Sequence, residues 1–250
     1  MFINRVIFIQ ILVNSVVTEQ IPLQLSWQDG FSFENFFAGD SLKSNVEAVH
    51  HLREVASANS GDEQFLYLWG FANAGKSHLL QAACQHAVDS ELSVAYLPLT
   101  EIGELDPEMF TGLEQMSLVC IDDVQALAGN KLCEEALFHL YNRMREAGSK
   151  MIVAGDVAPK ALPIKLADLQ SRLSWGPVFH LQELNDQNKV EALQLRAVAR
   201  GFELTEEVGL FLIRRSARDM PSLFALLDRL DEASLAKHRK LTIPFVRDLI

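Results

Sequence analysis

A glycine-rich segment at positions 70–77 carries residues whose types and spacing can bind phosphate. It reads GFANAGKS and matches the pattern G-x-x-x-x-G-K-[ST]. Gly70 and Gly75 let the backbone turn so that its N–H groups face inward. Lys76 can then reach the β and γ phosphates, and the Ser77 hydroxyl can hold Mg²⁺. The segment therefore predicts a site for a nucleoside diphosphate or triphosphate together with Mg²⁺.

The context of this segment agrees with that chemistry. Residues 65–69 form an apolar run of strand length, and residues 76–88 carry apolar side chains at helical spacing. Between a strand and a helix start, backbone amides and the positive end of the helix dipole can converge on one phosphate. We therefore predict a nucleotide site rather than an ordinary glycine turn. The residues expected around the nucleotide also include Asn73, Ala74 and His78.

A pair of acidic residues follows another apolar run. Residues 118–121 read LVCI and are followed by Asp122 and Asp123. At the carboxyl edge of a parallel sheet, Asp122 would complete the Mg²⁺ shell with Ser77, and Asp123 would orient or deprotonate water. Taken alone, an apolar strand that ends in aspartate is weak support. Two helix-capping aspartates are the alternative interpretation.

The elements that must position these residues alternate between strand and helix up to residue 181. A second helical pattern, at residues 131–147, is closed by Gly148. This alternation predicts an α/β domain with a five-stranded parallel sheet flanked by helices. The expected strands are 65–69, 94–97, 118–121, 151–154 and 178–181.

After residue 181 only helical patterns remain. The first helix is expected to begin at a cap at Asn185 or Asp186 and to run to Arg200, with Gly201 as its C-cap. Three further helices are expected behind caps at Thr205, Asp219 and Thr242, with Pro221 in the first turn of the second of these. The sequence therefore predicts a small all-helical domain appended to the α/β domain.

Composition and charge restrict the partners. The chain has 250 residues, 22 Lys plus Arg against 33 Asp plus Glu, and a formal net charge of −11. An acidic chain is poorly suited to clamp a phosphate backbone, so contact with DNA is expected to be local or to come only through a partner. The three cysteines lack metal-site spacing and lie in apolar or helical runs, which indicates reduced buried thiols in a cytoplasmic protein.

The amino terminus is apolar but is not expected to reach a membrane. Residues 1–17 carry one charge, Arg5, and resemble a weak signal peptide. The run is shorter than the roughly 20 residues that a spanning helix needs, and no small-residue cleavage site follows it. The sequence leaves two interpretations of residues 1–17 open: a strand at the edge of the sheet, or an extension that results from an upstream start codon.

Together these elements resemble an AAA+ ATPase core with its helical lid. Three phrases sharpen the resemblance towards the nucleotide-binding domain of the bacterial replication initiator DnaA: FENF at 33–36, CIDDVQ at 120–125 and LQSRLSWG at 169–176. DnaA continues into a helix-turn-helix domain, which finds no counterpart here. The resemblance therefore implies a protein that does not read the origin itself.

Two phrases in the helical region are specifically similar to the Hda family of short DnaA homologues. They are LQLRA at 193–197 and RGFEL at 200–204. The resemblance runs from about residue 26 to residue 250. It implies a leader at 1–25, an AAA+ nucleotide-binding domain at 26–184 and a helical lid domain at 185–250.

The resemblance also implies roles for three further residues. Asp156 is similar to the sensor 1 residue, with an ordinary turn aspartate as the alternative, and Arg172 matches the arginine finger. Pro221 stands where the family has its sensor 2 arginine, although Arg218 could substitute for it. Because proline has neither charge nor N–H, weak sensing of a γ-phosphate in cis is expected. That favours a switch holding ADP, or another nucleoside diphosphate or triphosphate, over a vigorous ATPase.

The leader holds a short peptide of the form Q-x-x-L-x-L at residues 20–25. It resembles the peptide by which Hda-type proteins dock on the sliding clamp, the β subunit of DNA polymerase III. An extended segment would place Leu23 and Leu25 in an apolar pocket while Gln20 satisfies polar groups at the rim. The alternative is an edge strand that continues from the apolar amino terminus.

The resemblance thus implies a negative regulator of replication initiation, an inhibitor that docks on the clamp and stimulates ATP hydrolysis by DnaA through an arginine finger in trans. Its partners would be the clamp and DnaA, and a homodimer is compatible with it. The competing hypothesis is a self-contained AAA+ ATPase, such as a helicase loader or small remodeller.

Overall fold

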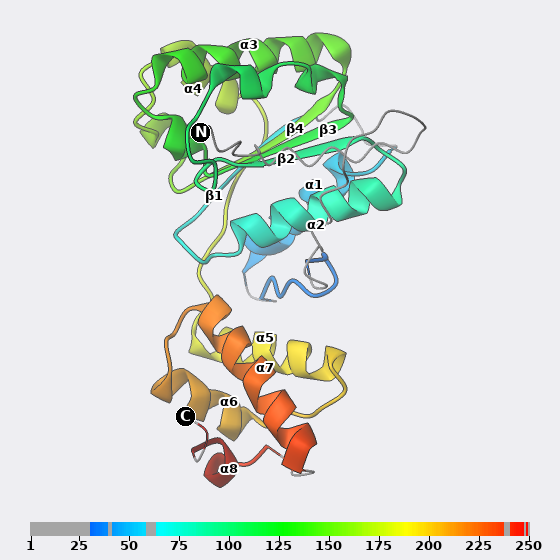
Figure 1. Ribbon diagram of the computed structural model, residues 1–250, viewed down its shortest axis with the longest axis vertical. Coiled ribbons are helices and arrows are strands. Elements are labelled where there is room, and N and C mark those ends of the chain that lie inside the picture. The colour runs from blue at the N-terminus through cyan, green and yellow to red at the C-terminus, as the bar shows by residue number, and fades with distance from the viewer. Residues whose placement is uncertain (1–30, 40–41, 59–63, 238–240, 248, 250) are drawn as a thin grey trace, which may run out of the picture. The chain divides into compact units, whose positions relative to one another are not determined.

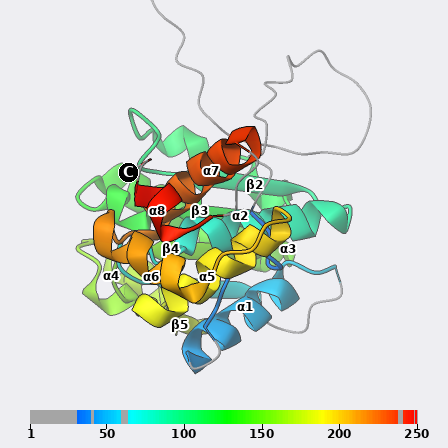
Figure 2. The same ribbon diagram turned by 90° about the horizontal axis from the view of Figure 1, so that it is seen from below.

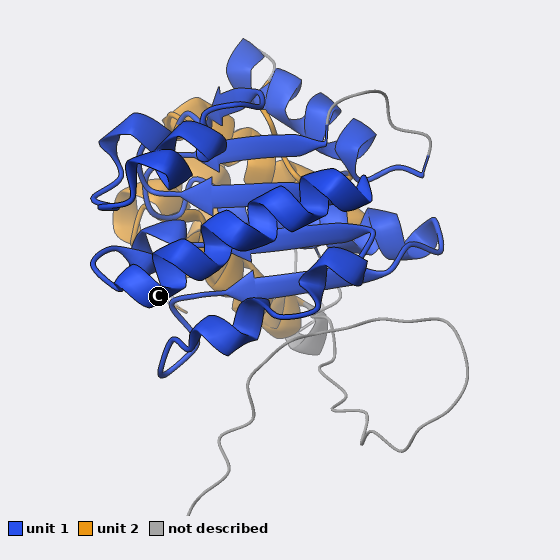
Figure 3. Ribbon diagram, turned by 90° about the horizontal axis from the view of Figure 1, so that it is seen from above, with its two compact units in different colours: residues 1–33, 42–182 blue, residues 34–41, 183–250 orange. Residues whose placement is uncertain are grey.

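The chain is described here from a computed structural model. The structure describes residues 31–39, 42–58, 64–237, 241–247 and 249. The residues fall into two compact units, one of 1–33 with 42–182 and one of 34–41 with 183–250 (Figure 3). The expected leader at 1–25, with the candidate clamp peptide, lies outside the described residues.

The first unit is built on a five-stranded parallel sheet, which confirms the predicted α/β fold. The strand order is β2-β3-β4-β1-β5, so β4 lies between β1 and β3. The strands show no regular alternation of burial, because helices cover both faces of a parallel sheet. The strands are β1 (Phe65–Trp69), β2 (Val94–Pro98), β3 (Leu118–Asp122), β4 (Lys150–Gly155) and β5 (Val178–His180).

Two helices lie on each face of the sheet, as Figure 1 shows: α1 and α2 on one, α3 and α4 on the other. Helix α1 lies beside β5 (Figure 2), where the Asn45 side-chain amide exchanges two hydrogen bonds with the Gln182 backbone, at 3.1 and 2.8 Å. The helices are α1 (Lys43–Val55), α2 (Lys76–Asp89), α3 (Lys131–Ala147) and α4 (Ala167–Leu173). Short 3₁₀ turns occupy Pro107–Phe110 (η1), Leu113–Gln115 (η2), Val124–Leu127 (η3) and Pro159–Ala161 (η4).

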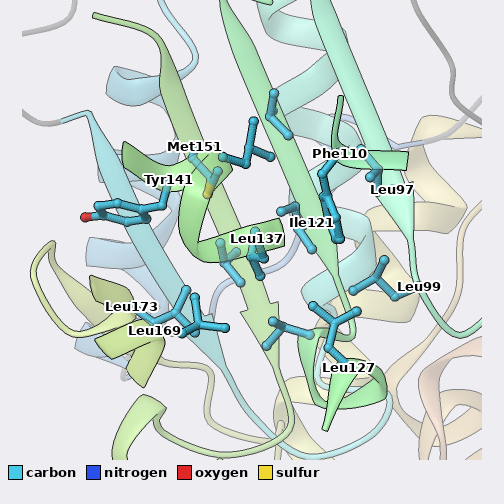
Figure 4. Packing of buried hydrophobic residues seen from close by; sticks show 14 of the residues in the cluster. Leu97, Leu99, Phe110, Ile121, Leu127, Leu137, Tyr141, Met151, Leu169 and Leu173 are labelled. Atoms are coloured by element: carbon cyan, nitrogen blue, oxygen red, sulfur yellow. The ribbon is translucent and has the colours of Figure 1, made fainter. Parts of the chain in front are cut away.

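The main core fills the space between the sheet and α3 (Figure 4). Leu169 and Leu173, one turn apart on α4, are buried in this core. All three cysteines are free and buried. Other labelled members of the core are Leu97, Leu99, Phe110, Ile121, Leu127, Leu137, Tyr141 and Met151.

Helix α4 is anchored to α3 by one buried carboxylate. Glu134, in the first turn of α3, is 1% exposed and accepts hydrogen bonds from three backbone N–H groups. They belong to Gly129 at 2.9 Å, Lys165 at 3.0 Å and Leu166 at 2.9 Å. Because Leu166 directly precedes α4, these bonds fix where α4 begins relative to α3.

The second unit is all-helical after residue 183, as predicted. Three of its helices begin at a side-chain oxygen that accepts a backbone N–H bond: Asn185 accepts from Asn188, Thr205 from Val208 and Asp219 from Ser222. The expected C-cap at Gly201 is displaced by one residue: Arg200 is the cap, and Gly201 follows with φ +83°. The helices are α5 (Asp186–Ala199), α6 (Glu206–Arg215), α7 (Met220–Lys237) and α8 (Ile243–Arg247). Within the described ranges, no helix is both long and apolar enough to cross a bilayer.

Candidate nucleotide-binding site

The glycine-rich loop joins the end of β1 to the start of α2 and depends on its unusual backbone. Gly75 has φ +97° and Asn73 has φ +63°, both in the left-handed region that glycine and asparagine tolerate best. A Cβ at Gly70 would lie only 2.7 Å from the Leu181 carbonyl oxygen, so no side chain fits there. Ala74 completes the turn, its N–H donating to the Phe71 carbonyl at 3.2 Å.

The Lys76 ammonium lies within this loop. It is 7% exposed and donates to the carbonyl oxygens of Gly70 at 2.8 Å and Phe71 at 3.1 Å. In the described part of the chain no carboxylate pairs with it, so its positive charge is met by neutral carbonyls alone. A buried cation in these surroundings fits an anionic ligand, and a phosphate group supplies the missing negative charge.

Ser77 and Asp122 lie side by side across the loop and β3. The Asp122 carboxylate accepts hydrogen bonds from the Tyr96 hydroxyl at 3.0 Å and the Asp123 N–H at 3.0 Å. Asp122 is 1% exposed, and burial raises the pKa of its carboxyl above the usual range, while the nearby Ser77 hydroxyl opposes that shift. A hydroxyl beside a carboxylate fits Mg²⁺, which takes few protein ligands when phosphate oxygens complete its shell.

The Asp123 carboxylate is held by two neighbouring side chains. It accepts a hydrogen bond from the Thr100 hydroxyl at 2.7 Å and another from the Gln125 side-chain amide at 3.0 Å. Gln125 in turn accepts from the Asp156 N–H at 3.2 Å. Asp123 has φ +55° and makes no side-chain cap, so the helix-capping alternative does not describe it.

The strand order brings most of the expected residues to one edge of the sheet. Asp156 follows β4, which lies between β1 and β3, so it lies between the phosphate loop and the aspartate pair. His78 is an exception among the expected residues, because its ring contacts the segment before α1. The ring nitrogen lies 3.0 Å from the Ser32 carbonyl oxygen, and the ring packs edge-on against Phe31.

Arg172 lies at the opposite edge of the sheet from the phosphate loop, where the strands begin rather than where they end. It is in the last turn of α4 and lines a small cavity together with Phe65 and Gly176. Phe65 begins β1, whereas the phosphate loop follows the last residue of β1. Four steps of about 3.3 Å therefore separate the two edges by roughly 13 Å. The guanidinium carbon lies 4.1 Å from the centre of the Trp175 ring and 5.9 Å from that of Phe138.

Pro221 and Arg218 belong to the second unit. Pro221 lies in the first turn of α7, as the sequence indicates. Arg218 precedes that helix, and its guanidinium lies 3.9 Å from a carboxylate oxygen of Asp186. Both side chains are largely exposed, so this ion pair contributes little to stability.

The sequence interpretation missed four residues: the structure adds three of them to the surroundings of the aspartate pair and one to the surroundings of Arg172. Gln125 and Trp175 stand inside phrases already singled out, at 120–125 and 169–176, but nothing in those phrases assigns them a role. Thr100 and Tyr96 come from β2 and the turn after it, and no spacing rule connects them to the aspartates. Only the pairing of β2 with β3 brings them together.

Comparison with known proteins decides the family. Residues 27–180, more than half of the chain, match the family model of the bacterial DnaA ATPase domain. The chain belongs to the DnaA family of AAA+ proteins. Residues 186–250 match the model of the Hda lid domain. The resemblance to DnaA and Hda in the sequence is thereby confirmed, and this DnaA-family chain carries an Hda-type lid.

Solved structures agree with this assignment. Domain III of the replication initiation protein DnaA from Thermotoga maritima is 25% identical, with a TM-score of 0.71 over 88% of this chain and 95% of that one. AMPPCP-bound DnaA from Aquifex aeolicus is 22% identical, with a TM-score of 0.65 over 80% of this chain and 65% of that one. The RuvB Holliday junction branch migration motor of Thermotoga maritima, 15% identical, shares the fold with a TM-score of 0.62 over 87% and 72%.

The raised pKa of Asp122 gives the site an expected pH dependence. The carboxyl must lose its proton to bind Mg²⁺, and burial raises its pKa above the usual 3.8. We therefore expect the Mg²⁺-dependent part of ADP affinity to fall on acidification, and to begin falling at a higher pH than an ordinary aspartate would allow. Calorimetric ADP titrations with and without Mg²⁺ over a series of pH values measure it. Asp122→Asn should remove the Mg²⁺-dependent part at every pH, and an unchanged pH profile in that variant would contradict the assignment.

Proposed function

We propose that this protein is a nucleotide-bound regulator of replication initiation that stimulates ATP hydrolysis by DnaA. In this proposal its own loop holds ADP or another nucleoside diphosphate or triphosphate with Mg²⁺, and Arg172 acts in trans on the nucleotide of DnaA. Membership of the DnaA family and the Hda-type lid support it. Hydrolysis would convert the initiator to its diphosphate form and so limit repeated initiation.

The observation that carries the proposal is the separation of Arg172 from its own phosphate loop. Arg172 lines a small cavity with residues 65–67 of β1, and its ring partner Trp175 lines a second hollow with Gln64 and Phe65. The phosphate loop begins after the last residue of β1. An arginine that contributes to phosphate chemistry must donate N–H groups directly to phosphate oxygens, over less than about 3 Å. Arg172 therefore does not reach the nucleotide of its own loop within this unit, and this separation supports a role on the nucleotide of another subunit.

The cis site supports holding a nucleotide more than turning it over. Lys76, Ser77 and Asp122 offer a cation, a hydroxyl and a carboxylate at one edge of the sheet, and the DnaA of Aquifex aeolicus was solved in an AMPPCP-bound form. Both oxygens of Asp123, the candidate base, already accept side-chain hydrogen bonds. Pro221 offers no charge at the sensor 2 position.

The chemistry that Arg172 would supply is electrostatic. A guanidinium is planar and always charged, and it can donate two parallel N–H bonds to the oxygens of a γ-phosphate. Negative charge develops on those oxygens as the phosphoryl group transfers to water, so the arginine stabilises the transition state more than the ground state. The Mg²⁺ bound with the nucleotide neutralises charge on the same phosphates.

The candidate clamp peptide gives a prediction that is independent of the ATPase chemistry. Replacing Gln20, Leu23 and Leu25 together by alanine should abolish retention on immobilised sliding clamp, because these residues supply the apolar and polar anchors of an extended segment. ADP binding should be unchanged. Retention of the triple variant at the level of the unaltered protein would show that clamp docking does not use this peptide.

The deciding experiment measures phosphate release from ATP-loaded DnaA in the presence of clamp-loaded DNA. Adding this protein with ADP should raise DnaA turnover strongly, whereas the protein with ATP alone should release phosphate slowly. The competing hypothesis, a self-contained AAA+ ATPase such as a helicase loader or small remodeller, uses the same phosphate loop and predicts the reverse. Fast turnover by the isolated protein without stimulation of DnaA would replace the proposal with that hypothesis.

A further inference from the structure

Two arginines share one tryptophan ring at the edge of the sheet that carries Arg172. The guanidinium carbons of Arg172 and Arg145 lie 4.1 and 4.6 Å from the centre of the Trp175 ring. Arg145 comes from the last turn of α3 and Arg172 from the last turn of α4. Trp175 is 54% exposed, so the ring that holds both cations faces solvent.

Neither arginine is neutralised by the protein around it. In the ranges that the structure describes, no carboxylate lies within 4 Å of either guanidinium, and the π faces of Trp175 and Phe138 are the contacts that hold them. Burial raises the pKa of the Tyr141 hydroxyl to about 12, and the nearby positive charges of Arg172 and Arg145 oppose that shift. Two like charges next to one ring repel each other until an anion binds between or over them.

Both arginines open onto the same surface hollow. It has a volume of about 480 Å³ and is lined by Arg145, Arg172, Asn142 and Glu146. A carboxylate ligand would neutralise one of the two guanidinium groups, whereas a terminal phosphate, with nearly two negative charges, matches both. Because Glu146 also lines the hollow, its surface is not uniformly positive. Such a surface disfavours an extended polyanion such as DNA and favours one compact anion.

The geometry of this pair is fixed by the fold. The Glu134 carboxylate on α3 holds the backbone at Lys165 and Leu166, directly before α4. Leu169 and Leu173 bury one face of α4 in the core, as Figure 4 shows. Helices anchored in this way keep the bases of both arginine side chains in place without a ligand, so a receptor for an anion is preorganised.

We propose that Arg145 is a second cation of the trans site, so that Arg145 and Arg172 together receive the terminal phosphates of a nucleoside triphosphate bound in a partner AAA+ subunit. Trp175 is the positioning residue that orients both guanidinium groups. This inference rests on the proposed function and adds two residues to it. Four or more N–H donors then surround the phosphate where one arginine alone would offer at most a single two-bond contact.

In the test, ADP-bound variants of the whole chain are titrated into ATP-loaded DnaA with clamp-loaded DNA, and the rate of phosphate release is measured. The titration gives two separate quantities, the maximal stimulated rate and the concentration of variant that gives half of it. Arg145→Ala should lower the maximal rate about tenfold with an unchanged ADP-induced thermal shift. Trp175→Ala should lower it similarly. Trp175→Phe should restore most of the loss, because phenylalanine keeps an aromatic face for both guanidinium groups.

The matched control is Lys131→Ala, which removes one positive charge from the exposed beginning of α3, about 21 Å along the helix from Arg145. It should stimulate like the unaltered protein. The inference is overturned if Arg145→Ala equals Lys131→Ala at saturation, or if Arg145→Ala changes only the half-saturating concentration. If Trp175→Phe is as defective as Trp175→Ala, Trp175 does not orient the arginines as proposed. Full stimulation by Arg172→Ala would instead contradict the proposed function. The failure of this inference and the failure of the proposed function can therefore be told apart.

Discussion

Arg172→Ala is expected to reduce stimulation of DnaA's ATP hydrolysis to background. Arginines supplied across an interface contribute roughly 10³–10⁵ in rate in GTPases, and Arg172 is the one group that the family resemblance assigns to this role. The side chain is half-buried, contacts the rings of Trp175 and Phe138, and makes no ion pair among the described residues, so its loss leaves no buried charge without a partner. Folding, ADP binding and clamp retention should therefore stay close to those of the unaltered protein.

Arg172→Lys tests whether charge alone is sufficient. Lysine keeps the positive charge but cannot reproduce the planar two-bond contact with phosphate, so it should restore little of the rate. The measurement is phosphate release from ATP-loaded DnaA with clamp-loaded DNA and each variant, with Lys131→Ala as the charge-matched control. Undiminished stimulation by Arg172→Ala would exclude the proposed action in trans.

Lys76→Ala should remove most of the stabilisation that ADP with Mg²⁺ gives to the protein. At a ligand concentration 100 times the dissociation constant, binding stabilises a protein by about 2.7 kcal/mol, and a variant that no longer binds loses that increment. The physical reason is the position of the ammonium, which is buried in the loop and, among the residues that the structure describes, hydrogen-bonds to the carbonyls of Gly70 and Phe71 and to no carboxylate. In this proposal the phosphate of the nucleotide neutralises the charge of the Lys76 ammonium.

Lys76→Met separates charge from packing, because methionine keeps most of the length of the side chain. Both variants should lose the ADP-induced thermal shift while unfolding cooperatively without ligand. Thermal unfolding with increasing ADP at fixed Mg²⁺ measures the effect. Equal ADP stabilisation of the unaltered protein and of both variants would mean that the loop is a structural turn.

Local patterns in the sequence were sufficient for the elements and for one side of the candidate site. The five strands begin and end within one residue of the predicted runs, and the caps at Asn185, Thr205 and Asp219 lie where predicted. The phosphate loop and the aspartate pair were also predicted from spacing. These features depend on neighbouring residues, because helical periodicity, capping and a glycine turn are all decided within a few positions of the chain.

What only the tertiary structure decided are the contacts between segments that are distant in the sequence. The strand order puts Asp156 between the loop and Asp122, and the pairing of β2 with β3 gives Asp123 its bond from Thr100. Arg145 and Trp175 meet because Glu134 fixes the start of α4 against α3. No periodicity encodes such meetings: a pattern says which face of an element is buried, whereas the packing of whole helices and strands decides which exposed ends come together.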